Sequence, residues 1–319
     1  MKYVLAPLAG FTDAPFRRLC REGGADLTYG EMVSAAGLAH GSDPTFRLLD
    51  TMPGEGDVAM QIFGADEKEV AFSAKVVSEV AKRTEYGRIV ELNLNAGCPV
   101  PKVVRCGAGA RLIADPDKIH RLSKAMVENT SIPVTLKTRL GPHPKDTRIF
   151  EIVDAAQSAG VKGIIVHARY TSQMHGGPVA LDTLAEVVRR ATVPITGNGS
   201  VVDTASAAKM EATGVSAIMI GRAALAKPWI FSQLKGGLPS MLENYSAKEL
   251  ASIHLKYLLD FRELQVKRYP QDRIASVDGY ASVKMHVHLF RYFAGLPGAA
   301  ALRKRLSSIR TLDEIRAIL

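Results

Sequence analysis

Cysteine is scarce in this chain: Cys20, Cys98 and Cys106 are the only three among 319 residues. So few thiols exclude the disulfide frameworks of small secreted proteins. No apolar run approaches the ~20 residues that a helix needs to span a bilayer. The N-terminus also lacks the charged and apolar zones of a signal peptide. These absences predict a protein of the reducing cytoplasm that is not associated with a membrane.

Other familiar signals are missing as well. No Gly-x-Gly-x-x-Gly fingerprint follows the first expected strand, so nothing indicates the common dinucleotide-binding fold. There is no solenoid-type repeat and no low-complexity tract. The chain is 47% hydrophobic, which provides for a sizeable core and argues against global disorder.

Short apolar runs alternate with amphipathic stretches along most of the chain. Val70, Ala74 and Val77 recur at helical spacing between two such runs. Asp115 and Asp203 stand where helices are expected to start. Repeated strand-then-helix units without hairpin signals predict a parallel (β/α)8 TIM barrel of the α/β class. The eight expected strands are Val4–Leu8, Leu27–Val33, Val58–Phe63, Ile89–Asn95, Val134–Thr138, Gly163–His167, Pro194–Gly197 and Ala217–Ile220.

The pattern changes near Leu238, where Gly237 and Pro239 interrupt the chain. Beyond this point the spacing is helical, as in the stripe formed by Ile253, Tyr257 and Phe261. We therefore expect a barrel over residues 1–238 and an all-helical domain over residues 239–319.

The helical part is rich in positive charge. The whole chain has a formal net charge of +9, and ten Lys and Arg residues stand against four Asp and Glu from Lys267 onward. A clustered basic surface attracts polyphosphates through counterion release. This favours a nucleic-acid partner, although a mildly basic enzyme without one remains an alternative.

Polar side chains follow almost every expected strand of the barrel. Active residues of TIM barrels sit at the C-terminal ends of the strands. Any one of these side chains taken alone is better explained as structural, but their shared placement at one mouth favours a common site. The residues are Gln61, Asn95, Cys98, Lys137, Arg139, His167, Arg169, Asn198, Gly221 and Arg222.

Cys98 stands out because it lies between Gly97 and Pro99, directly after a strand. A turn there points the side chain away from the core. A thiol with a reference pKa of ~8.5 stays mostly protonated at neutral pH and can donate a proton. Most free cysteines are buried small hydrophobes, which is the role that we expect for Cys20. Cys106 lies on the same loop as Cys98; a packing role is the expectation, and support of Cys98 is the alternative.

Two consecutive loops carry glycines that open helices, one around Gly199 and one around Gly221 and Arg222. Such loops expose backbone N–H groups to an anion, and barrels often hold a phosphate after strands seven and eight. A phosphate site together with Lys137 and a thiol suits flavin mononucleotide (FMN), because a lysine can stabilise the anionic reduced ring. No metal site is expected: His286 and His288 are two residues apart and fall on different faces of a helix.

Several of these segments together closely resemble the tRNA-dihydrouridine synthases, in order along essentially the whole barrel. The helical part resembles the family's RNA-binding domain less distinctly. The matching segments are Ala6-Pro7-Leu8-Ala9-Gly10-Phe11-Thr12-Asp13, Glu31-Met32-Val33, Gln61-Ile62-Phe63-Gly64, Leu94-Asn95-Ala96-Gly97-Cys98-Pro99, Lys137-Thr138-Arg139, His167-Ala168-Arg169, Gly221-Arg222-Ala223 and Pro228-Trp229-Ile230-Phe231.

The resemblance implies FMN-dependent reduction of uridines in tRNA, with NADPH as reductant and no protein partner. It implies that Cys98 protonates uracil C5 while the reduced flavin gives hydride to C6, and that Asn95, Arg139 and Arg169 face the substrate. The implied flavin contacts are Ala6, Pro7, Gln61, Lys137, His167, Asn198, Gly199, Gly221 and Arg222.

The chain departs from the family pattern at a few positions. Leu8 stands where methionine is usual, Ser200 where an acid is usual, and Arg111 where a small or apolar residue is usual. The main alternative is an FMN barrel acting on a free pyrimidine, as dihydroorotate dehydrogenases do. A barrel that only binds RNA and a Schiff-base aldolase using Lys137 are the other classes left open.

Overall fold

The computed structural model describes residues 1–237, 239–271, 274–297 and 299–319, without the side chains of Ala299, Ala300 and Arg303. The expected domain boundary at Leu238 lies outside the described residues, as do two charged residues of the basic segment, Asp272 and Arg273. The barrel and the helical part are therefore described on either side of that boundary.

Eight parallel strands form a closed barrel in the order β1 to β8, and β8 pairs with β1. This confirms the expected α/β fold. Strands β3 and β4 are buried along most of their length, as expected for strands covered by helices. The strands are β1 Lys2–Leu5, β2 Leu27–Ser34, β3 Asp57–Phe63, β4 Arg88–Ala96, β5 Val134–Arg139, β6 Ile164–His167, β7 Ile195–Asn198 and β8 Ala217–Ile220.

The first strand is shorter than expected, because it ends at Leu5 and not at Leu8. Pro7 has no N–H for the ladder. The carbonyl of Leu8 instead accepts the N–H groups of Phe11 and Thr12, both at 3.0 Å, and so turns the chain. This early turn leaves Ala6 and Pro7 at the rim of the barrel.

Helices surround the barrel, and capping side chains start several of them. The carboxylates of Asp115 and Asp203 accept N–H groups of the first turns of α6 and α9, which confirms the expected starts. The helices of the barrel part are α1 Ala14–Glu22, α2 Ala35–Ala39, α3 Asp43–Phe46, α4 Glu67–Arg83, α5 Pro101–Arg105, α6 Pro116–Val127, α7 Ile149–Ser158, α8 Leu181–Arg190, α9 Thr204–Glu211, α10 Arg222–Ala226 and α11 Ile230–Lys235.

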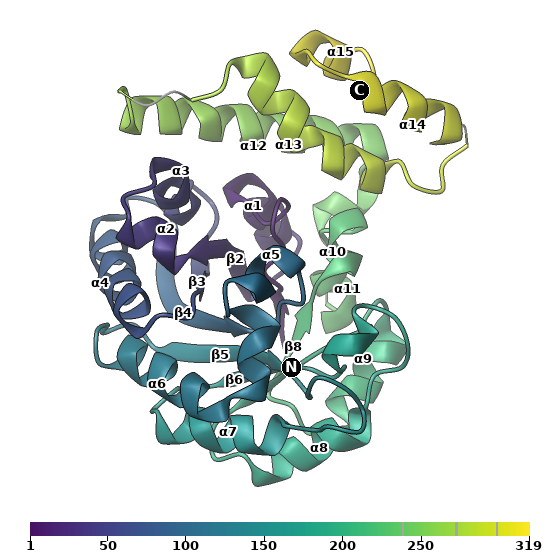
Figure 1. Ribbon diagram of the computed structural model, residues 1–319. Coiled ribbons are helices and arrows are strands. Elements are labelled where there is room, and N and C mark those ends of the chain that lie inside the picture. The colour runs from purple at the N-terminus through teal and green to yellow at the C-terminus, as the bar shows by residue number, and fades with distance from the viewer. Residues whose placement is uncertain (238, 272–273, 298) are drawn as a thin grey trace.

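The C-terminal helices lie together across one side of the barrel (Figure 1). They are α12 Ala247–Arg268, α13 Val277–Tyr292, α14 Ala299–Ser308 and α15 Leu312–Arg316. Helix α12 packs against α1, and α13 packs against α10. Buried residues of α12 and α13, among them Leu258 and Leu289, belong to the same hydrophobic cluster as buried residues of the barrel strands and of the helices around them. The helical part is therefore packed onto the barrel rather than tethered to it.

Some basic residues of the helical part contact the barrel instead of facing solvent. Arg268 forms an ion pair with the buried Asp50 at 2.7 Å, and Lys284 lies 3.4 Å from Asp13. Arg291, Lys304 and Arg310 are exposed. Across the described ranges, the search for a helix that is both long and apolar enough to cross a membrane finds none.

Candidate active site

Amide side chains from β3 and β4 are linked at the mouth of the barrel. Gln61 is fully buried; its Nε2 donates to Asn93 at 2.7 Å, and its Oε1 accepts from Asn95 at 2.8 Å. Asn93 donates in turn to Thr135 on β5 at 2.7 Å. Because each amide side chain is a hydrogen-bond partner of the next, the rotamers of Gln61 and Asn95 are fixed relative to each other.

The side chain of Asn95 holds the loop that carries Cys98 through two hydrogen bonds. The Oδ1 atom of Asn95 accepts the backbone N–H of Gly97 at 3.1 Å and that of Cys98 at 3.0 Å. The carbonyl of Cys98 accepts the N–H of Ala110 at 2.9 Å. Cys98 itself is half-buried, and the expected opening of its thiol onto the mouth stays a prediction.

Arg139, at the end of β5, is buried and 2% exposed. It donates to the carbonyls of Gly97 at 3.0 Å, Tyr170 at 3.2 Å and Met174 at 2.7 Å. Burial and the neighbouring Arg169 lower the pKa of Arg139 to about 10. Arg139 therefore ties the Cys98 loop to the loop after β6, and its expected contact with substrate stays a prediction.

Lys137 lies on the same strand and reaches toward β7, where its amine donates to Asn198 at 3.2 Å. Burial, and then the positive charge of Arg139, lower the pKa of Lys137 to about 7, against a smaller opposing effect of Cys98. The amine of Lys137 and the sulfur of Cys98 are thus close enough to interact electrostatically.

The end of β6 supplies His167, which is 7% exposed. Burial, followed by the charges of Lys137, Arg139, Arg169 and His175, strongly lowers the pKa of His167. Arg169 lies 3.3 Å from its Nε2 atom. Since arginine can only donate, Nε2 accepts and the proton of the neutral ring is on Nδ1.

Arg169 is also largely buried, at 4% exposure. Its Nη2 atom donates to the carbonyl of Gly177 at 2.7 Å and to the hydroxyl of Ser200 at 2.5 Å. Ser200, one of the departures from the family pattern, therefore serves as an acceptor for Arg169. The expected contact of Arg169 with substrate stays a prediction.

The loops after β7 and β8 carry the two glycines. The expectation that both open a helix is wrong for Gly199, because α9 begins only at Thr204. Gly199 has a φ of +134°, and a Cβ there would lie 2.8 Å from Val179 and 3.2 Å from the ring of His167. Gly221 is the N-cap of α10, and Arg222 at the start of that helix is exposed. A side chain at Gly199 would collide with Val179 and His167, so this position requires glycine.

Ala6 and Pro7 complete the mouth between β1 and β8. The N–H of Ala6 donates to the carbonyl of Ile220 at 2.8 Å. A Cβ at Gly221 would lie 3.7 Å from the Cβ of Ala6. The structure thus brings the first and last strand ends together, as closure of the barrel requires.

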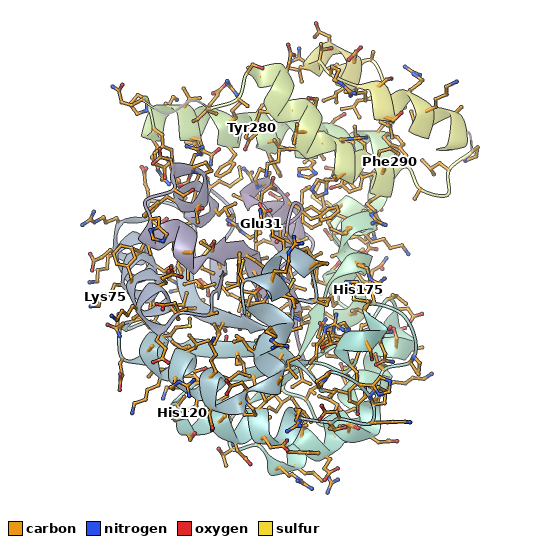
Figure 2. All side chains as sticks on the ribbon, viewed as in Figure 1. Glu31, Lys75, His120, His175, Tyr280 and Phe290 are labelled. Atoms are coloured by element: carbon orange, nitrogen blue, oxygen red, sulfur yellow. The ribbon has the colours of Figure 1, made fainter. Side chains whose placement is uncertain are left out.

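His175 is a mouth residue that the sequence analysis missed. Its ring stacks on that of His167 with 6.2 Å between centroids, and its carbonyl accepts from Arg222 at 3.1 Å. Figure 2 labels it on the barrel part, below the C-terminal helices. The Gly176-Gly177 pair just after it was a signal, because it marks a loop that bends back over the mouth.

Glu31, on β2, contacts the turn that follows β1. Its carboxylate accepts the N–H of Gly10, which has a φ of +79°, at 2.5 Å. Cys106 is exposed, so its expected packing role is wrong; it ends the short helix α5 at the surface. Cys20 is buried in the core, as expected.

Comparison with known proteins identifies the family. The model of the dihydrouridine synthase family matches residues 4–318. The chain belongs to the dihydrouridine synthase family. It is 34% identical over 266 residues to tRNA-dihydrouridine synthase B of Escherichia coli K12, covering 82% of this chain and 81% of that protein. It is 32% identical to the protein of the same name from Pectobacterium carotovorum, with the same coverage.

Membership in this family makes the chain a dihydrouridine-forming oxidoreductase and confirms the resemblance of its motifs. The fold is shared more widely. A mutant of morphinone reductase in complex with tetrahydroNAD superposes with a TM-score of 0.52 at 10% identity, covering 75% of this chain and 88% of that one. At such low identity this likeness concerns the barrel alone.

Proposed function

We propose that this chain reduces the C5–C6 double bond of uridines in tRNA, with FMN at the barrel mouth and NADPH as reductant. The observation that carries the proposal is the placement of Cys98 beside Lys137: Asn95 accepts the N–H of Cys98 and is the register partner of Lys137 on the neighbouring strand. A proton donor and a cationic group therefore flank the space in which a ring would lie. The family match over residues 4–318 supports the same reaction.

The residues of the mouth fit FMN. The donor groups near Gly199 suit a phosphate, because Arg222 is exposed and positively charged and lies 3.1 Å from the carbonyl of His175. We assign the phosphate to Asn198, Gly199, Gly221 and Arg222. Gln61, Lys137, His167 and the backbone of Ala6 and Pro7 would hold the ring and its side chain.

When bound, FMN supplies the hydride for uracil C6. Cys98 holds a proton on Sγ and delivers it to C5, where negative charge develops. Asn95 keeps the Cys98 loop in place through its two N–H contacts. Arg139 holds the far side of that loop through the carbonyl of Gly97. Both are positioning residues in this account.

Lys137 adjusts the charge of the mouth. With a pKa of about 7 in the flavin-free chain, its amine changes charge near neutral pH. An anion in the cavity favours the protonated amine, so Lys137 would gain a proton when it faces the reduced cofactor.

A uridine inside folded tRNA has to leave its stack before it can reach this mouth. The exposed cations Arg291, Lys304 and Arg310 of the helical part are suited to the RNA backbone. We therefore assign tRNA docking to residues 239–319 and catalysis to residues 1–238. We infer a cytoplasmic location, because the proton donor must stay a reduced thiol.

The decisive experiment compares substrates for the FMN-loaded protein with NADPH. Dihydrouridine should form in unmodified tRNA and hardly at all from free uridine or orotate. Comparable rates on the free base would favour the dihydroorotate dehydrogenase-like alternative. A colourless protein that cannot be reconstituted with FMN would overturn the proposal.

A further inference from the structure

Three ligand-type side chains meet in the boundary between the barrel and the C-terminal helices. Asp13 caps α1, His254 belongs to α12 and His288 to α13. Their exposures are 7%, 0% and 1%, and one ligand atom from each lies within 4.8 Å of the other two. In Figure 2, Glu31 marks the barrel side of this boundary and Tyr280 the helical side.

Both histidines carry a buried ring nitrogen without a hydrogen-bond partner. These atoms are Nε2 of His254 and Nδ1 of His288. A buried polar atom without a partner is destabilising, so natural structures rarely leave two together. The opposite nitrogen of His254, Nδ1, is 2.9 Å from the hydroxyl of Tyr292. That contact leaves Nε2 as the free nitrogen of His254, and such an outer partner is usual for metal-bound histidines.

The surroundings keep both imidazoles neutral. Burial is the main cause that lowers the pKa of His288 to about 4, and it also lowers that of His254. The ring of Phe16 packs on both, with centroids 5.8 Å from His254 and 4.7 Å from His288. Neutral imidazole nitrogens in an apolar shell retain the lone pair that a metal ion requires.

We propose that Asp13, His254 and His288 bind one zinc-type divalent ion. Two imidazole nitrogens and a carboxylate oxygen are a common zinc set, whereas Mg²⁺ and Ca²⁺ prefer oxygen ligands only. Tetrahedral ligands at ~2.1 Å lie about 3.4 Å apart. The three side chains therefore close in slightly on the ion, and water takes the fourth position.

One neighbouring cation would have to give way to this ion. The N–H of Phe16 donates to Asp13 Oδ1 at 3.2 Å, and the amine of Lys284 lies 3.4 Å from Asp13 Oδ2. The ion would replace Lys284 at Oδ2, and Lys284 would keep Glu31, 3.8 Å away, as its partner. The ion would join α12 and α13 to α1, and so fix the helical part on the barrel.

The test measures zinc bound after equilibrium dialysis of the intact FMN-loaded protein at micromolar free zinc. The expected result is one ion per chain, with a rise of several degrees in Tm. Asp13→Asn and His288→Gln should each lose both effects. Asparagine also caps helices, so Asp13→Asn keeps the start of α1 intact.

His286→Gln is the matched control, because His286 lies two residues from His288 on α13 and also has a buried nitrogen without a partner. It should bind zinc like the parent. Absence of zinc from the parent, or equal zinc in the parent and Asp13→Asn, would overturn the proposal. If His288→Gln fails to fold, the zinc bound by the parent, by Asp13→Asn and by His286→Gln still tests the proposal. None of these outcomes depends on the reaction proposed above.

Discussion

The Oδ1 atom of Asn95 accepts the backbone N–H of Cys98 at 3.0 Å and that of Gly97 at 3.1 Å. The same side chain donates to Gln61 at 2.8 Å. One amide thus connects the loop of the proposed proton donor to the buried network at the barrel mouth. The position of the thiol depends on an acceptor three residues before it.

Asn95→Ala should lower kcat for tRNA uridine reduction by roughly tenfold to a hundredfold, because misplacing a reacting group is costly. Asn95→Asp keeps the acceptor for both N–H groups and loses the donor to Gln61, so its kcat should lie between the other two. Steady-state kinetics on unmodified tRNA would measure this series. Equal rates for the parent and Asn95→Ala would show that the loop holds its position without the amide.

Cys98→Ala should reduce dihydrouridine formation by about 10²-fold or more, since the positioned acid is lost. Flavin content and NADPH oxidation should remain near the parental values. Mass spectrometry of the tRNA nucleosides gives the readout. Cys106→Ala is the matched control, because this exposed thiol follows on the same segment. Parental activity in Cys98→Ala would remove the role assigned to this residue.

Gly199→Ala should release flavin during purification. Its Cβ would lie 2.8 Å from Val179 and 3.2 Å from His167, at a φ of +134° that L side chains rarely adopt. Gly41→Ala provides the control: its φ is +71°, but its Cβ would meet nothing within 4 Å. The flavin absorbance per chain compares the two variants. Full flavin retention in Gly199→Ala would place the cofactor elsewhere.

Lys137→Met should stabilise the flavin-free protein, and more at pH 6 than at pH 9. The folded pKa of Lys137 is about 7, below the ~10.5 of an unfolded chain. Between these values the unfolded state binds more protons, so stability of the parent rises with pH across this window. Below pH 7 the parent carries the full cost of a buried ammonium. Urea midpoints of both proteins at several pH values test the sign; a difference independent of pH would contradict the shift.

Much of the barrel could be predicted from the sequence. Alternating apolar runs and local caps such as Asp115 and Asp203 act within a few residues, so strands and helix starts follow from the chain itself. The error at the first strand also has a local cause, since Pro7 ends the ladder before Leu8. The mouth residues follow from one topological fact, that parallel strands end on one side of the sheet.

The contacts between distant segments could not be predicted in this way. No spacing rule shows that Arg139 is buried beneath two loops, or that His175 stacks on His167. His286 and His288 look unrelated to a metal site when only their spacing on one helix is considered.

The sequence alone therefore determined the barrel, the helical part and the polar groups at the strand ends, because each depends on periodicity or on nearest neighbours. Tertiary structure decided which of those groups are accessible and which are held by carbonyls. It also decided that Asp13, His254 and His288 meet. Their proximity depends on how α12 and α13 pack on α1, and that packing is set by the whole buried surface rather than by any local segment.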